Sequence, residues 1–106
     1  MTDGPLRVES NIDDAGVARV RLHGELDLDR AASVADQLSA LAGQGATSVQ
    51  IDAGGLSFID SSGLRALLTA REALSAAGAT MEMTQLSPAV ERVLDMTGTR
   101  ALLIGD

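Results

Sequence analysis

The sequence predicts an α/β fold: a mixed, mostly parallel sheet that opens with a hairpin and carries its helices largely on one side. Segments in which apolar and polar residues alternate, as in half-buried strands, are followed by stretches with apolar residues at helical spacing. The length of 106 residues suits one domain over 1–106 with one core. The expected order is strand, strand, helix, strand, helix, strand, helix, strand.

The first two strands are predicted to form a hairpin. Apolar residues alternate with charged ones over 6–10 and again over 18–23, and the DDAG sequence at 13–16 is a turn signal. His23 falls on the outward-facing register of the second segment, which it shares with Arg19 and Arg21. We therefore expect a hairpin with one buried face and a solvated histidine on the other.

The first helix follows Asp29, because apolar residues recur there at helical spacing as far as Leu41, and Gly43 is its expected stop. The third strand is predicted around Val49 and Ile51, which alternate with polar residues, and is expected to end at the Ala53-Gly54-Gly55 sequence. This strand is short in the prediction.

The remaining elements have clear boundary signals. A second helix is predicted from Ser62 to a left-handed cap at Gly78, and a strand follows through Met81 and Met83. The third helix begins at Ser87-Pro88, an N-cap followed by proline at the first helical position, and ends at Gly98. The apolar run 101–104 is expected to be the last strand.

Composition argues against several kinds of partner. The eight cationic residues, all arginines, are outnumbered by fifteen acids, so the formal net charge is -7. Because binding to nucleic acid and to anionic membrane surfaces depends on cationic contacts, we expect neither partner. Cysteine is absent, the chain begins with polar residues, and no apolar run is long enough to span a membrane. A cytoplasmic protein is therefore expected.

Known catalytic motifs are missing. A serine hydrolase would pair Ser61 or Ser62 with His23, the only histidine, but the G-x-S-x-G motif does not occur around these serines. The phosphate-binding loop of nucleotide-binding proteins requires a lysine, which the sequence lacks. The acids are too scattered to predict a metal site. We expect no enzymatic activity, no cofactor and no metal.

The DSSG sequence at 60–63 precedes the second predicted helix and allows two interpretations. Asp and Ser are preferred acceptors for the unpaired backbone NH groups of a helix start, so the stretch can be a cap and nothing more. It also follows a parallel strand, and the carboxyl edge of such a sheet is where α/β proteins usually carry their sites. The two serines are expected to be exposed at that edge.

A hydroxyl at this position can also act as a binding switch. Phosphorylation of Ser61 would bring about -1.5 to -2 charges to the positive end of a helix dipole, which the fold can carry. A partner that had docked the neutral hydroxyl would instead meet a poorly matched dianion. A loss of about 3 kcal/mol there lowers affinity roughly 100-fold.

Three stretches resemble segments of one known family. Residues 56–64 (LSFIDSSGL) are similar to the phosphorylation-site segment of bacterial anti-sigma-factor antagonists of the STAS family. Residues 22–27 (LHGELD) resemble the family's G-E-L-D segment, and 87–98 (SPAVERVLDMTG) resemble its third helix. The stretches agree in order and spacing over nearly the whole chain. The resemblance implies a STAS-like fold for 1–106.

The resemblance also implies partner switching. In such systems the unmodified antagonist binds an anti-sigma factor that is also a serine kinase, and this releases the sigma factor for transcription. The kinase inactivates the antagonist by phosphorylating the first serine after the aspartate, and a serine phosphatase restores it. That serine is Ser61 here, with Ser62 as the fallback. No cofactor is implied, because ATP belongs to the kinase.

A partner-binding surface around the phosphorylation site is implied as well. Its residues are Asp27, Asp60, Ser62, Gly63, Leu64 and Arg65. Arg65 departs from the family pattern, since many relatives have glycine there. Its guanidinium would lie one helical turn beyond Ser61, where it pairs with the phosphate or with a partner's carboxylate, or is simply a solvated surface residue.

Two expectations concern the limits of the resemblance. The family's helix after the last strand is expected to be missing, because the sequence stops at Asp106. STAS-like domains also serve as regulatory subunits of transport complexes or as parts of larger sensory assemblies, without phosphorylation. The intact DSSG sequence at 60–63 favours the switch over these alternatives.

Overall fold

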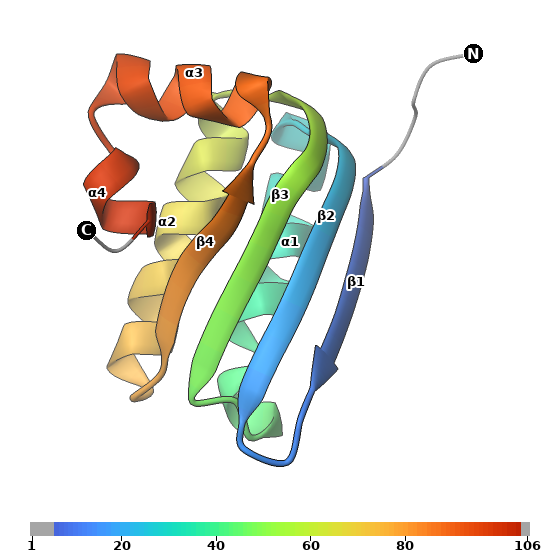
Figure 1. The fold of residues 1–106 in the computed structure, drawn as a ribbon, viewed down its shortest axis with the longest axis vertical. Helices are drawn as coiled ribbons and strands as arrows, with labels where there is room; N and C mark the ends of the chain where they lie inside the picture. Colours follow the sequence, from blue (N-terminus) through green and yellow to red (C-terminus); the bar gives the residue numbers. More distant parts are fainter. Residues whose placement is uncertain (1–5, 105–106) are drawn as a thin grey trace.

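A four-stranded sheet organises the computed structural model, which describes residues 6–104 (Figure 1). The strands lie in the order β1 (Arg7–Ile12), β2 (Val17–Leu26), β3 (Ser48–Ile59) and β4 (Thr80–Leu86). β1 runs antiparallel to β2, whereas β3 runs parallel to both of its neighbours. The predicted leading hairpin and mostly parallel sheet are therefore confirmed.

The long helices α1 (Leu28–Ser39) and α2 (Ser61–Ala76) cover one face of the sheet (Figure 1). α3 (Pro88–Thr97) lies across the end of the sheet at which β4 terminates, and α4 (Arg100–Ile104) lies beside β4 and α2. Among residues 6–104, no helix lies on the opposite face of the sheet. In the part of the chain that the structure describes, no helix is long and apolar enough to cross a membrane.

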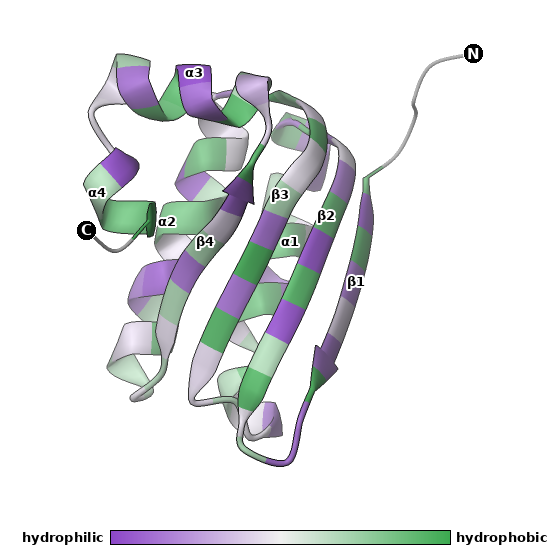
Figure 2. Ribbon diagram, in the orientation of Figure 1, coloured by the Kyte–Doolittle hydropathy of each residue, from purple (hydrophilic) through white to green (hydrophobic). Residues whose placement is uncertain are grey.

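Aliphatic side chains from the covered face of the sheet and from the helices form the core. In β2, for example, Ala18, Val20 and Leu22 are buried while Arg19 and Arg21 face solvent. Figure 2 shows the resulting alternation of hydrophobic and hydrophilic residues along β2 and β3. Leucine supplies most of the largest fully buried side chains, so the core needs no aromatic residue. A strand period of two produces this pattern.

The hairpin turn is held by one carboxylate. Asp13 accepts hydrogen bonds from the backbone NH groups of Ala15 and Val17, and from the Arg19 guanidinium at 2.8 Å. The hydrogen bond from Arg19 is the main reason why the pKa of Asp13 is lowered. Gly16 closes the turn with a φ of +86°, a conformation that glycine adopts without strain. The turn predicted at 13–16 is confirmed.

Two predicted element ends are wrong. α1 ends at Ser39, and the left-handed residue that follows the short 3₁₀ turn Ala42–Gln44 is Gly45, not Gly43. β3 does not stop at 53–55 but continues to Ile59. A Cβ on Gly55 would lie 2.5 Å from Nδ1 of His23 on β2, so glycine here admits a neighbouring side chain rather than ending the strand.

The C-terminal segment 101–104 is helical, so the predicted last strand is wrong, as is the expectation that the family's C-terminal helix is missing. Leu103 is fully buried whereas Ala101 and Leu102 are exposed, which is the spacing of a helix with one inward residue per turn.

The boundaries of α3 are as predicted. Ser87 accepts the NH of Val90 at 3.2 Å, and Gly98 is left-handed at the other end.

Candidate functional site

The candidate site begins where β3 passes directly into α2. Asp60 is the only residue between the two elements. Its backbone is extended, and its carboxylate accepts the NH of Gly63 at 2.9 Å, which satisfies one of the unpaired NH groups of the helix start. The predicted capping role of Asp60 is confirmed, and Ser61 becomes the first helical residue.

The two serines differ in exposure. Ser61 is exposed, as expected, whereas Ser62 is half-buried, so the expectation that both serines are exposed is wrong for Ser62. Both lie at the carboxyl edge of the parallel strands β2 and β3, as expected. The hydroxyl of Ser61 is therefore accessible to a modifying enzyme or a binding partner.

Two residues of the expected partner-binding surface point inward instead. Gly63 is buried, and a Cβ there would lie 2.5 Å from the backbone oxygen of Leu26 and 2.8 Å from its Cγ. Leu64 is only 6% exposed. These residues pack the first turn of α2 against the end of β2. Their burial favours a role in positioning this turn, and their place on a partner-binding surface stays a prediction.

A groove of about 350 Å³ runs between α1 and α2, beside Ser61. Its floor and walls combine small apolar, hydroxyl and cationic groups. They belong to Leu28, Ala31, Ala32, Ala35, Ser61, Ser62, Arg65, Ala66 and Thr69. Arg65 is thus brought into the same lining as the two serines. The residues contributed by α1 were not recognised in the sequence, because they belong to the site only once the two helices are adjacent.

Asp27 lies next to the groove but not in its lining. It occupies the N-cap position of α1, yet its side chain accepts no capping hydrogen bond. Both of its carboxylate oxygens lie 3.2 Å from Nη1 of Arg30. Asp27 thus holds Arg30 at the start of α1, and its place on a partner-binding surface stays a prediction.

His23 is separate from the serines. Its Nε2 lies 3.6 Å from Glu9 on β1, and the groove lining does not include it. The expectation of a solvated ring is partly wrong, because Nε2 is shielded from solvent and has no hydrogen-bond partner among residues 6–104. The groove that contains Ser61 and Ser62 therefore does not include His23 as a base for either serine.

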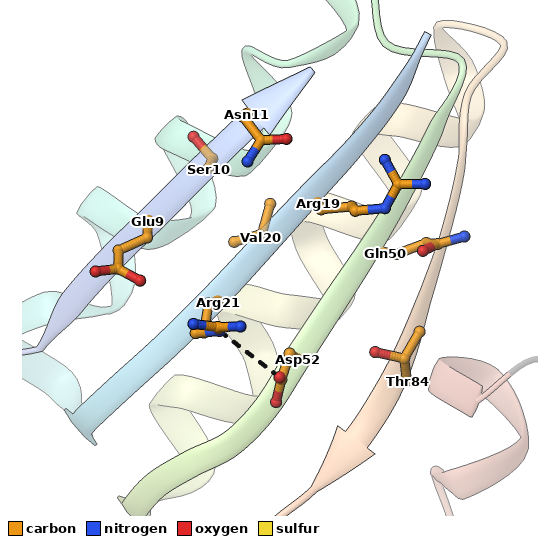
Figure 3. A pocket seen from close by; sticks show the side chains of 9 residues that line it. All are labelled: Glu9, Ser10, Asn11, Arg19, Val20, Arg21, Gln50, Asp52 and Thr84. Carbon is orange, nitrogen blue, oxygen red and sulfur yellow. Dashed lines mark ion pairs between the residues drawn. The ribbon is translucent and has the colours of Figure 1, made fainter. Parts of the chain in front are cut away.

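The open face of the sheet contains a shallow polar depression (Figure 3). Ion pairs partly neutralise the charges here: Arg21 on β2 lies 3.8 Å from Asp52 on β3. Within β1, Arg7 donates a hydrogen bond to Glu9 that lowers the pKa of Glu9. No group of three or more acidic or histidine side chains able to hold a metal occurs in the described part of the chain. The groove beside Ser61 differs from this depression because it combines two serine hydroxyls with the guanidinium of Arg65.

Comparison with known proteins decides the family. A family model described as "Mlab, STAS domain" matches residues 10–104. The chain belongs to the STAS domain family. The match includes α1 to α4 and most of the sheet, and it contains the DSSG sequence at 60–63.

Solved structures similar to this STAS domain agree with it in fold. The anti-sigma factor antagonist SpoIIAA in its unphosphorylated form has 24% identity and a TM-score of 0.78, over 92% of this chain and 86% of that one. An anti-sigma factor antagonist from Mycobacterium paratuberculosis has 24% identity and a TM-score of 0.79, over 95% and 84%. The phosphorylated Bacillus SpoIIAA has 23% identity and a TM-score of 0.71, over 92% and 88%.

The cap of α2 can be tested by mutation. Asp60→Ala is expected to lower the free energy of unfolding by about 1 kcal/mol, because the NH of Gly63 loses its acceptor. Asp27→Ala is the matched control, since Asp27 holds the same N-cap position without a capping hydrogen bond and should lose less. Urea denaturation followed by circular dichroism measures both. Equal losses would contradict the capping role of Asp60.

Proposed function

We propose that this STAS domain is an anti-sigma-factor antagonist that binds an anti-sigma factor while Ser61 is unmodified and is released when Ser61 is phosphorylated. The observation that carries the proposal is the exposed hydroxyl of Ser61 at the first residue of α2, beside a groove open to a partner. The names of the similar solved structures support it. They are anti-sigma factor antagonists, and SpoIIAA is described in unphosphorylated and phosphorylated forms.

Electrostatics explain why a phosphate on Ser61 would be tolerated in the isolated domain but not in the complex with a partner. A phosphate on Ser61 would lie at the positive end of the α2 dipole, so the isolated domain tolerates it. In a complex the same phosphate would be desolvated against a surface shaped for a hydroxyl. The penalty falls on binding and not on folding.

The proposal assigns the chemistry to the partners. The anti-sigma factor is itself the serine kinase and brings the ATP, and a separate serine phosphatase restores the hydroxyl. The STAS domain supplies the substrate serine, no catalytic group and no cofactor, and acts in the cytoplasm. Ser62 is the fallback acceptor, although its half-buried side chain is the less accessible one.

A phosphorylation assay tests this proposal. The protein is incubated with ATP and a candidate serine kinase, and the modified peptide is sequenced by mass spectrometry. We expect phosphate on Ser61 in the wild-type chain and none at that peptide in Ser61→Ala, with Ser62→Ala modified normally. Phosphate found only on Ser62 would show that Ser62, and not Ser61, is the phosphorylation site. Stable copurification with an ATPase or permease, without any phosphorylation, would favour the transport-subunit alternative.

A further inference from the structure

Ser61 and Arg65 occupy the same lining of the groove between α1 and α2. They are four residues apart on α2, so their side chains are neighbours on one face of the helix. Both are exposed. A group attached to Ser61 is therefore within reach of the Arg65 guanidinium without any change in the backbone.

Arg65 has no acidic partner within residues 6–104. Several other arginines in this range are paired, for example Arg30 with Asp27 and Arg100 with Asp95. Arg65 is also the one charged residue among those lining the groove. In a chain with a formal net charge of -7, the groove thus presents an uncompensated cation that suits an anionic group.

The rest of the groove is suited to an apolar side chain. Leu28 at its rim is 70% exposed, although it is a large hydrophobic residue. Ala31, Ala32 and Ala35 on α1 leave space because their side chains are short. A matching segment would therefore carry an apolar side chain and a carboxylate close together.

We propose that the groove binds a short acidic segment of the anti-sigma partner, which places an apolar side chain over the α1 alanines and a carboxylate on Arg65. Phosphate on Ser61 then captures Arg65 and removes it from that carboxylate. This inference rests on the proposed function and adds the chemistry of the partner and the part of Arg65 in the switch.

The competition follows from charge and geometry. A phosphate carries more charge than a carboxylate and offers three strong acceptor oxygens, which a guanidinium can engage through two parallel hydrogen bonds. Its position four residues before Arg65 makes the contact intramolecular. Phosphorylation therefore introduces repulsion and also withdraws the cation that the partner needs.

One experiment examines the contact between phosphate and Arg65 without any partner. Phosphoserine is incorporated at position 61 during translation, and its ³¹P signal is titrated with pH in the full chain and in the Arg65→Ala variant. Because Arg65 stabilises the dianion, the second phosphate pKa should be lower with Arg65 present. Arg92→Ala should leave the titration unchanged, because Arg92 is an exposed arginine on α3 with no acidic partner within residues 6–104. Superimposable curves for the wild type and Arg65→Ala would overturn the capture.

A second experiment measures binding by calorimetry, with the kinase that labels Ser61 as the probe. We expect Arg65→Ala to weaken binding of the unmodified protein about tenfold, and Arg92→Ala less than twofold. Ala32→Trp, which fills the groove, should also weaken binding, whereas Ala73→Trp on an exposed part of α2 should not. The loss caused by phosphorylation should be about tenfold smaller in Arg65→Ala than in the wild type.

The outcomes separate this inference from the proposed function. If phosphorylation of Ser61 releases the kinase but Arg65→Ala and Ala32→Trp bind like the wild type, the acidic-segment inference is wrong and the switch stands. If the kinase neither labels Ser61 nor distinguishes the two forms, the proposed function itself fails.

Discussion

Ser61→Asp is expected to lower the affinity for the anti-sigma factor by about 100-fold, whereas Ser61→Ala binds as tightly as the unmodified protein. The aspartate places a permanent negative charge where a neutral hydroxyl docks, and a mismatch of about 3 kcal/mol accounts for that factor. Alanine removes the hydroxyl without adding charge. It should therefore also resist inactivation by the kinase, so that binding becomes constitutive.

The measurement is isothermal titration calorimetry, with a thermal melt of each variant. Aspartate at the first position of α2 interacts favourably with the helix dipole, so Ser61→Asp should remain folded. Ser33→Asp is the matched control, because Ser33 is an exposed serine on α1 outside the groove lining. Equal affinities of Ser61→Ala and Ser61→Asp would rule out the switch.

Gly63→Ala is expected to destabilise the fold by about 2 kcal/mol, although alanine is the better helix former. The added Cβ would lie 2.5 Å from the backbone oxygen of Leu26, which cannot move aside as a flexible side chain can. Overpacking costs about 3 kcal/mol at the upper end of its usual range, and the gain in helix propensity offsets about 1 kcal/mol. Gly63 thus fixes the distance between the start of α2 and the end of β2.

Chemical denaturation measures this effect, and Gly43→Ala is its control. Gly43 has open space around the position of a Cβ, so alanine there should be nearly neutral. A Gly63→Ala variant as stable as Gly43→Ala would show that the first turn of α2 is not tightly packed.

The fold was predictable from sequence wherever a local signal and the hydrophobic period agreed. α3 has both a Ser87-Pro88 start and a Gly98 stop, and its bounds were predicted correctly. The course of β3 was not, because Gly54 and Gly55 resemble a strand end until the His23 side chain of β2 is placed against Gly55. The run 101–104 was misassigned because a short apolar segment fits strand and helix equally well.

The candidate site was likewise predictable where a local sequence signal exists, and not where only tertiary packing brings residues together. The capping pattern at Asp60 places Ser61 at a helix start and in solvent. The family resemblance placed Gly63 and Leu64 on the surface that carries Ser61, but the helix turns both residues toward the core. The alanines of α1 carry no local signal, since only tertiary packing brings them beside α2.

The direct passage from β3 into α2 through Asp60 has a consequence for signalling. Only Asp60, the N-cap of α2, separates the strand from the helix, so this short connection leaves the backbone little room to rearrange when Ser61 is modified. Under the proposed switch, the unmodified and phosphorylated proteins would therefore share one backbone and differ in the charge at Ser61 and in the group that Arg65 contacts. A partner must discriminate between them by electrostatics, and that discrimination weakens as ionic strength rises.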